Sequence, residues 1–366
     1  MNIVFIYPNI GSSGGVPKVQ LLKASYLIDY YKYKVTIVCD KKWENEPVFF
    51  PVHQEIKFVY LEYSSPSYTK DLLLYLNSSK ADIISCIALS EKDVKTVYKV
   101  KSKAKKIAVY HTSYLYKYGF TGIKQNFRNW FSEKLAFFHF IRMIKKYDAF
   151  TVLSEGDKVW FSKFLSNVIS IGNPIEEINN FESPNYSSQK VIAVGRLEGV
   201  KNFSELIDIW KQIHVKFPNW ELNIFGEGPL EEKLQNKIDE FGLSSVIHLC
   251  GKSEKIMQEM KMHSVLVMTS RYEGFGNVLL EGAYLGLPIV LYDCGNGPKS
   301  IVINNKNGFV IQNRNQNSFV KQLKELINSK EMREEMGRNG QKVANEFILP
   351  KIMEKWHLLF SKLSKK

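Results

Sequence analysis

A chain of 366 residues is longer than one hydrophobic core usually becomes, so its length predicts two domains. Its 45% hydrophobic and 24% charged residues are ordinary for a soluble globular protein. The formal net charge of +13 is unevenly distributed, because residues 1–180 hold 25 lysines and arginines against 16 acids, whereas residues 181–366 hold 25 against 21. A basic first half predicts an anionic partner there, either nucleic acid, a phospholipid surface or a phosphorylated substrate.

Several classes of protein are disfavoured. The four cysteines form no C-x-x-C and have no nearby histidine pair, which argues against a disulfide framework and a structural zinc and favours reduced thiols in a cytoplasmic protein. The first residues carry no basic leader, and no stretch approaches the roughly 18 apolar residues that span a bilayer. Because nothing resembles a nucleic-acid-binding module, we assign the basic surplus to phosphates on lipids or substrates.

The first half alternates strand-like and helical patterns. A β-branched and aromatic run at Ile3–Tyr7 is followed by a Gly- and Ser-rich loop and then by helical spacing of apolar residues up to Leu27. Further strands are expected at Val35–Val38, Lys57–Leu61, Asp82–Ile87, Ile107–Tyr110 and Ala149–Leu153. This alternation predicts a parallel, doubly wound sheet.

The same pattern restarts after a polar segment near residues 171–188. Strands are expected at Val191–Val194, Leu222–Phe225, Ile247–Cys250, Val265–Thr269, Ile289–Tyr292 and Gly308–Ile311. The fold class predicted is therefore α/β, with two Rossmann-like doubly wound domains facing a central cleft. We expect the domains at residues 1–175 and 176–345, and the amphipathic C-terminal helix of residues 346–366 could pack back across the seam.

The stretch S-R-Y-E-G-F-G-N-V-L-L-E, residues 270–281, combines two acids with a glycine-rich turn. A helix is expected at Asn277–Leu285, and its first N–H groups, with Gly274 and Gly276, are suited to bind an anion or hydroxyls. Glu273 and Glu281 either accept hydrogen bonds from ligand hydroxyls or, as acids near a helix N-terminus, interact favourably with the helix dipole.

Cations suited to phosphates follow the strand at Val191–Val194. Gly195 and Arg196 come directly after it, and Lys201 lies five residues further on. A guanidinium and an ammonium in one loop suit a diphosphate, although two surface cations of a basic protein would give the same pattern.

The first half offers weaker signals. Gly14 and Gly15 precede a helix and allow close approach of a phosphate or sugar. His111 ends a strand and either donates to a ligand or is a satisfied structural histidine. The basic, aromatic-rich helix expected at Lys124–Lys146 either lies on an anionic membrane surface or buries one face in the domain.

No P-loop, H-E-x-x-H, G-x-S-x-G or D-x-D loop is present, so the sequence predicts neither a metal nor a cofactor. Together, the motifs resemble those of the retaining glycosyltransferases of family four, which have the two-domain fold called GT-B. The resemblance covers the whole chain and rests on the G-G loop, His111, G-R-L-x-x-x-K at Gly195–Lys201, G-x-G-P at Gly226–Pro229 and E-G-F-G-x-x-x-x-E at Glu273–Glu281.

This resemblance implies a role for each motif residue. Arg196 and Lys201 would hold the donor diphosphate, Glu281 the ribose and Glu273 the donor sugar, which His111 would also contact. Backbone groups would complete the donor site at Gly14, Gly15, Gly195, Gly251, Lys252, Gly274, Phe275, Gly276 and Asn277.

The implied activity is metal-independent, retaining transfer of a hexose or N-acetylhexosamine from a nucleotide sugar, UDP-linked, to a glycan, a lipid-linked or another cell-surface polymer acceptor. The enzyme would act in the cytoplasm or at the inner face of the membrane, in the manner of bacterial capsule and exopolysaccharide enzymes. A nucleotide-sugar epimerase of the same fold and a non-catalytic sugar-binding protein are the alternatives. The sequence departs from the family pattern at Gly282 and at Cys294–Ser300, where an acid common in the family is missing.

Overall fold

The computed structural model describes residues 1–88, 90–112, 127–178 and 183–365, and for residues 127–133 and 313 the backbone alone. The chain divides into two compact units. Unit 1 consists of Met1–Pro174 together with Leu349–Lys366, and unit 2 consists of Ile175–Ile348. The C-terminal helix therefore belongs to the unit that contains the N-terminus.

Unit 1 is built on a seven-stranded, wholly parallel sheet with the strand order β3-β2-β1-β4-β5-β6-β7. The strands are β1 (Asn2–Ile6), β2 (Lys34–Asp40), β3 (Lys57–Leu61), β4 (Ile83–Ile87), β5 (Lys105–Tyr110), β6 (Ala149–Val152) and β7 (Val168–Ser170). β-Branched residues fill β1, β2 and β4, and these strands are buried as expected for a sheet covered on both faces.

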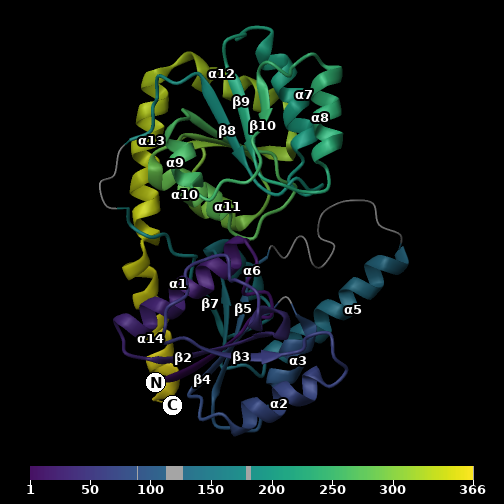
Figure 1. Ribbon diagram of the computed structural model, residues 1–366, viewed down its shortest axis with the longest axis vertical. Helices are drawn as coiled ribbons and strands as arrows, with labels where there is room; N and C mark the ends of the chain where they lie inside the picture. The colour runs from purple at the N-terminus through teal and green to yellow at the C-terminus, as the bar shows by residue number, and fades with distance from the viewer. Residues whose placement is uncertain (89, 113–126, 179–182, 366) are drawn as a thin grey trace. The chain divides into compact units, whose positions relative to one another are not determined.

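Helices connect and cover these strands. They are α1 (Gly15–Asp29), the 3₁₀ turn η1 (Lys41–Glu44), α2 (Tyr68–Ser78), α3 (Glu91–Tyr98), α5 (Phe127–Ile144), α6 (Glu155–Phe161) and α14 (Leu349–Ser364). α2 packs on α3 and α3 on α5, while α1 packs on α14 (Figure 1).

Unit 2 repeats this architecture with six parallel strands in the order β10-β9-β8-β11-β12-β13. The strands are β8 (Lys190–Val194), β9 (Glu221–Phe225), β10 (Ile247–Leu249), β11 (Val265–Met268), β12 (Ile289–Tyr292) and β13 (Gly308–Ile311). The order reverses between β8 and β11, and in open parallel sheets ligands bind beside such a switch point, at the carboxyl ends of the strands.

Its helices lie on both faces of the sheet. They are α7 (Phe203–His214), α8 (Glu231–Glu240), α9 (Ile256–Lys261), α10 (Asn277–Leu285), α11 (Asn296–Ile301), α12 (Gln316–Asn328) and α13 (Lys330–Ala344), with the 3₁₀ turns η2 (Gln312–Arg314) and η3 (Asn345–Phe347). In Figure 1, α7 and α8 lie together on one side of the sheet, and α9 and α10 lie on the other.

Close packing explains why a glycine stands at position 282, where the sequence departs from the family pattern. A Cβ atom on Gly282 of α10 would lie 2.5 Å from a methyl group of Leu266 on β11. Alanine would therefore clash unless Leu266 moved, and glycine at this position lets the helix that begins the candidate site approach the sheet closely.

The predicted fold class of two Rossmann-like α/β domains is confirmed. The three-residue strand β7 is absent from the sequence prediction. In the helix expected at Lys124–Lys146, residues 124–126 lie outside the described residues. Phe137 and Phe140 of α5 are buried in the core of unit 1, so these two rings are unavailable to a membrane, while Phe138 is exposed. No helix in the described part of the chain is long and apolar enough to cross a bilayer.

Candidate active site

The unit 2 motifs converge at the carboxyl edge of its sheet, because each follows the end of a strand. Gly195 follows β8 and donates its N–H to the carbonyl oxygen of Phe225 at 2.9 Å. Gly226 follows β9 and donates to the carbonyl oxygen of Gly251, beyond β10, at 2.7 Å. A Cβ atom on Gly226, whose φ is 144°, would lie 1.9 Å from the carbonyl oxygen of Gly195, so only glycine allows these loops to pack together.

An ion pair joins the two best-matched motifs. Lys201 Nζ lies 2.5 Å from Glu273 Oε1, and the two side chains are 22% and 14% exposed. Ser270 Oγ donates to the same carboxylate oxygen at 2.8 Å. The stem of Lys201 lies over Gly195, where a Cβ would stand 3.1 Å from its Cδ and Cε atoms. Lysine and carboxylate are thereby held at one point of the sheet edge.

Hydrogen bonds to backbone carbonyl groups fix the same two loops relative to each other. Thr269 Oγ1, at the end of β11, donates to the carbonyl oxygen of Lys201 at 3.0 Å. The N–H of Arg271 donates to the carbonyl oxygen of Val200 at 2.8 Å. Since the loops are connected before any ligand contacts them, the ion pair is pre-organised.

The glycine turn before α10 is shaped by another glycine that the motif reading did not identify. Gly276 caps α10 with a φ of 85°, a conformation that favours glycine. A Cβ atom on Gly297, at the start of α11, would lie 2.0 Å from the carbonyl oxygen of Gly274. The segment that replaces the usual family acid therefore packs directly against the turn, whose Phe275 side chain is buried.

The second acid lies inside the helix that follows the turn. Asn277 is the first residue of α10, and Glu281 follows one turn later with only 9% of its surface exposed. A carboxylate buried to this degree needs hydrogen bonds or a charged partner.

A second ion pair supports the site, and the sequence analysis missed it. Arg314 Nη2 lies 2.6 Å from Glu205 Oε2, and the hydroxyl of Tyr292 donates to Glu205 Oε1 at 2.7 Å. Burial alone would raise the pKa of Glu205, but the hydrogen bonds from Tyr292 and Arg314 hold it below its ordinary value. Arg314 Nη1 also donates to the carbonyl oxygen of Ser270 at 3.4 Å, which connects this pair to the Glu273 loop.

No motif marks Glu205 or Arg314. Only their positions in the fold could have pointed to them, because Glu205 is in the first turn of α7 and Arg314 closely follows β13.

Two other basic residues predicted for the donor site, Arg196 and Lys252, lie on the surface. The Arg196 side chain is 75% exposed and pairs with Glu198 at 2.8 Å, so it does not take part in the Lys201–Glu273 pair. Lys252 is exposed next to Gly251, whose φ of 67° turns the chain sharply after β10.

The unit 1 candidates lie at the carboxyl edge of the other sheet. Gly14 is the exposed N-cap of α1, and Gly15 is the first helical residue. His111 directly follows β5 and is buried, and its Nε2 lies 3.3 Å from Gln20 Nε2 on α1. Among the residues that the structure describes, none forms a hydrogen bond with the buried Nδ1 of His111.

A buried lysine accompanies this histidine. Lys23 is 1% exposed, and its Nζ lies 3.5 Å from the ring centre of Trp356 on α14. Burial lowers the pKa of Lys23 to about 7, and burial together with Lys23 lowers the pKa of His111 to about 3. His111 is therefore neutral at physiological pH, and its imidazole has one N–H donor and one acceptor nitrogen.

Comparison with known proteins connects this geometry to a family. Residues 174–343, which include the Lys201–Glu273 pair, match the family model described as glycosyl transferases group 1. An uncharacterized glycosyltransferase of Haemophilus influenzae is 27% identical over 97% of this chain and 98% of its own length. The amylovoran biosynthesis glycosyltransferase AmsD of Erwinia amylovora is 33% identical over 56% of this chain and 60% of its own length.

A solved structure extends the comparison to the fold. The pneumococcal O-GlcNAc transferase GtfA, in complex with UDP and GlcNAc, aligns with a TM-score of 0.79 at 14% identity and covers 99% of both chains. At this identity the similarity concerns the fold alone. The family model and the relatives support a glycosyltransferase, and the solved structure supports the two-domain GT-B fold.

Proposed function

We propose that this protein is a retaining, metal-independent glycosyltransferase of family four. It transfers a hexose or N-acetylhexosamine from a UDP-sugar to a glycan, lipid-linked or other cell-surface polymer acceptor. The observation that carries the proposal is the Lys201–Glu273 pair, held at 2.5 Å where two strand ends meet. A cation for phosphate and an acceptor for hydroxyls are thereby placed side by side, as a donor with a diphosphate next to a sugar requires.

Lys201 and Arg196 bind the diphosphate in this proposal. When the bond between the anomeric carbon and the diphosphate oxygen breaks, both electrons leave with the diphosphate, and the two cations stabilise the added charge. The acceptor oxygen forms its bond to the anomeric carbon on the same face, and its proton passes to the departing phosphate oxygen. Because the cations neutralise the leaving group, the step requires no metal.

The remaining residues position the donor. Glu273 accepts hydrogen bonds from the sugar, and Glu281 accepts them from the ribose. Backbone N–H groups from Gly274 to Asn277 hold further oxygens at the start of α10. Gly251 and Lys252 lie beside the base, and Gly195 completes the donor site.

In unit 1, His111 and the turn at Gly14–Gly15 contribute to sugar binding. The low pKa of His111 supports this role, because a neutral imidazole donates to a hydroxyl without adding a charge.

The named relatives support the class of product. AmsD is named for biosynthesis of amylovoran, and GtfA was solved with UDP and GlcNAc. We therefore propose a UDP-linked donor and a role in building a surface polysaccharide such as a capsule or exopolysaccharide.

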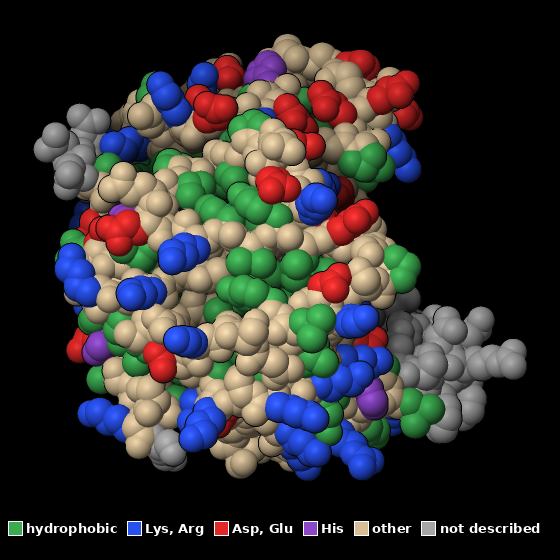
Figure 2. Space-filling view, turned by 60° about the horizontal axis from the view of Figure 1, so that its bottom comes forward, with side chains coloured by type: hydrophobic (Ala, Val, Ile, Leu, Met, Phe, Trp, Pro, Cys, Tyr) green, Lys and Arg blue, Asp and Glu red, His purple; other side chains and the backbone are tan. Residues whose placement is uncertain are grey.

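We also propose that unit 1 binds an anionic membrane surface where the acceptor is lipid-linked. Figure 2 shows lysine and arginine side chains gathered on the lower part of the face in view. Exposed Lys99, Lys101 and Lys103 precede β5, and exposed Lys145 and Lys146 follow α5. Lys146 Nζ donates to the Tyr98 hydroxyl at 2.9 Å and lowers its pKa, so the two segments form one positive surface.

The deciding experiment measures UDP release from a panel of UDP-hexoses and UDP-N-acetylhexosamines, with and without acceptor glycans and with and without a chelator. We expect acceptor-dependent turnover that survives chelation and a product with the donor's anomeric configuration by NMR. Donor consumption without an acceptor would indicate an epimerase instead, and failure on every donor would contradict the proposal. Sedimentation with phosphatidylglycerol vesicles but not with phosphatidylcholine vesicles tests the membrane surface separately.

A further inference from the structure

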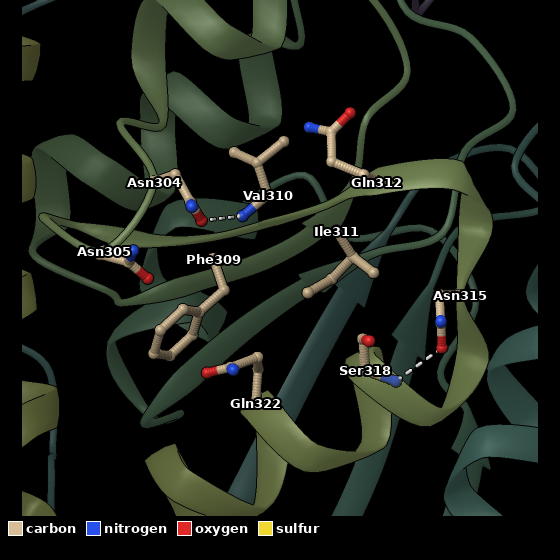
Figure 3. A pocket seen from close by; sticks show the side chains of 9 residues that line it. All are labelled: Asn304, Asn305, Phe309, Val310, Ile311, Gln312, Asn315, Ser318 and Gln322. Carbon is tan, nitrogen blue, oxygen red and sulfur yellow. Dashed lines mark hydrogen bonds between the residues drawn. The ribbon is translucent and has the colours of Figure 1, made fainter.

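Unit 2 contains a cavity whose residues have no role in the proposed donor site. Its volume is about 430 Å³, which is within the range of small-molecule sites. Figure 3 shows it between β13, the loop that precedes this strand, and α12. β13 is the last strand in its sheet, so the cavity lies at an edge of the sheet.

The lining of this cavity is uncharged and combines polar side chains with the apolar Phe309, Val310 and Ile311. It carries five carboxamides and one hydroxyl, from Asn304, Asn305, Gln312, Asn315, Gln322 and Ser318. A carboxamide both donates and accepts hydrogen bonds, so the lining matches a ligand that does both, such as one rich in hydroxyls. No ionisable side chain belongs to the lining, and a charged ligand would therefore find no counter-ion there.

Two of the carboxamides are held in place by the backbone. Asn304 Oδ1 accepts from the N–H of Val310 at 2.9 Å, and Asn315 Oδ1 accepts from the N–H of Ser318 at 2.9 Å (Figure 3). These bonds use the amide oxygens and fix the orientation of both side chains. Within the described part of the chain their NH₂ groups have no partner, so both remain available as donors to a ligand.

A third carboxamide lacks the hydrogen bond it needs. Gln322 Oε1 is buried and has no donor within the described residues. Buried polar atoms are rarely left without a partner, and a ligand hydroxyl at this position would satisfy the oxygen. In Figure 3 the Gln322 side chain points toward the ring of Phe309, so an acceptor and an apolar ring lie next to each other.

This combination matches the surface of a sugar, which carries hydroxyls at its rim and apolar C–H groups on its faces. We propose that the cavity binds an uncharged sugar residue, so that unit 2 holds a stretch of neutral glycan separately from the donor. The carboxamides contact the hydroxyls, Gln322 Oε1 accepts one of them, and Phe309 contacts the C–H face. The site extends the proposed function but does not depend on it, because binding requires no transfer.

Saturation-transfer NMR on the full chain tests this site with methyl α-glucoside, methyl α-galactoside and N-acetylglucosamine, and with glucuronate as the anionic comparison. We expect weak binding of at least one neutral sugar, with a dissociation constant on the order of 1 mM, and no binding of glucuronate. Saturating UDP should not displace the neutral sugar. Absence of binding, displacement by UDP or equal binding of glucuronate would each overturn the proposal.

Two variants and a control test whether the NMR signal comes from a sugar bound in this cavity. Gln322→Leu removes the unpaired oxygen at similar volume and should weaken binding by about tenfold or more. Gln312→Ala alters an exposed lining residue, which keeps the test open if Gln322→Leu does not fold, and it should also weaken binding. Gln258→Ala, at an exposed glutamine on α9, is the matched control and should bind as the parent does. Binding that is equal in all three variants would show that the sugar lies elsewhere.

Transfer to a short acceptor distinguishes this site from the donor site. Gln312→Ala should retain the parental kcat and donor KM. If the chain proved inactive with every donor, the binding experiment would still decide the cavity, so failure of the two proposals can be told apart.

Discussion

The two units have the same architecture, but the polar side chains at the carboxyl edges of their sheets differ in charge and in burial. In unit 2 the edge carries two ion pairs, Lys201–Glu273 and Arg314–Glu205, in which every side chain is partly exposed. In unit 1 the corresponding edge carries Gln20, Lys23 and His111, all buried, and no carboxylate pairs with Lys23 among the described residues.

The difference concerns which ligands each edge can bind. Exposed ion pairs can exchange partners with a charged ligand, because water and counter-ions solvate the groups during the exchange. Burial lowers the pKa of Lys23, and burial together with Lys23 lowers the pKa of His111, so both side chains favour their neutral forms. Unit 2 is thus suited to an anionic donor, whereas the edge of unit 1 is suited to uncharged hydroxyl groups.

The most severe test of this comparison removes the unit 2 lysine. Lys201→Met should lower kcat/KM by about 10²–10³, because it removes a cation that faces developing charge. Lys237→Met is a matched control, since Lys237 is also 22% exposed and pairs with Asp208 at 2.7 Å on the α7–α8 side. Steady-state kinetics of UDP release would check the pair of variants, and equal losses would contradict a special role for Lys201.

The second test alters the shape of the site without removing a charge. Gly297→Ala places a Cβ atom 2.0 Å from the carbonyl oxygen of Gly274, so the turn before α10 must shift. A shift of about 1 Å in positioning groups can cost roughly 100-fold in rate, and we expect a loss of that order. Gly199→Ala is the control, because no atom lies within 4 Å of its added Cβ. Kinetics that are unchanged in Gly297→Ala would show that the turn does not position the donor.

The third test separates the two acids. Glu281→Ala should mainly raise the donor KM, by about 10- to 100-fold, because hydrogen bonds to a charged group contribute about 1.5–3 kcal/mol. Glu273→Ala should mainly lower kcat. Initial rates over a range of donor concentrations distinguish the two patterns, and the assignment fails if neither parameter moves in either variant.

Sequence reasoning succeeded where a residue type is tied to local backbone geometry. The strand limits at Lys57–Leu61, Ile289–Tyr292 and Gly308–Ile311 and the helix Asn277–Leu285 were predicted to the residue, because glycines or polar turns border them. Lys201 and Glu273 each follow a strand of the same parallel sheet, and the carboxyl ends of such strands meet at one edge.

The rest depends on contacts between residues that are distant in sequence. Arg314 reaches Glu205 across 109 positions, and no local pattern signals such a pair. The burial of Lys23 could not be predicted either, since a lysine in an amphipathic helix is normally expected to face water. Trp356, which covers it, lies more than 300 residues away on α14.

The fourth test concerns this long-range pair. Arg314→Leu leaves Glu205 without its cation and removes the bond to the Ser270 carbonyl, so the Glu273 loop loses support. Because Arg314 acts through that loop, we expect a roughly tenfold fall in kcat with a smaller change in donor KM. Arg314→Lys restores a charge but not the two-sided contact, and it should recover only part of the rate. A change confined to KM would instead indicate that Arg314 binds the donor itself.

The smallest expected effect concerns the stability of unit 1 rather than activity. Burial in the folded chain lowers the pKa of Lys23 from its ordinary value of 10.5 to about 7. Between these values the unfolded chain binds more protons, so the free energy of unfolding rises with pH, by at most about 1.4 kcal/mol per pH unit.

Lys23→Met should remove this slope, so the stability advantage of the variant over the parent should shrink steadily from pH 7 to pH 9. Urea unfolding followed by circular dichroism at pH 6, 7, 8 and 9 would measure it. Gln20→Met, a neutral substitution one turn earlier on α1, should shift stability by the same amount at every pH in this window. A difference between the parent and Lys23→Met that stayed constant from pH 7 to pH 9 would mean that Lys23 keeps its proton when buried. The edge of unit 1 would then carry a charge, and the contrast between the two units would fail.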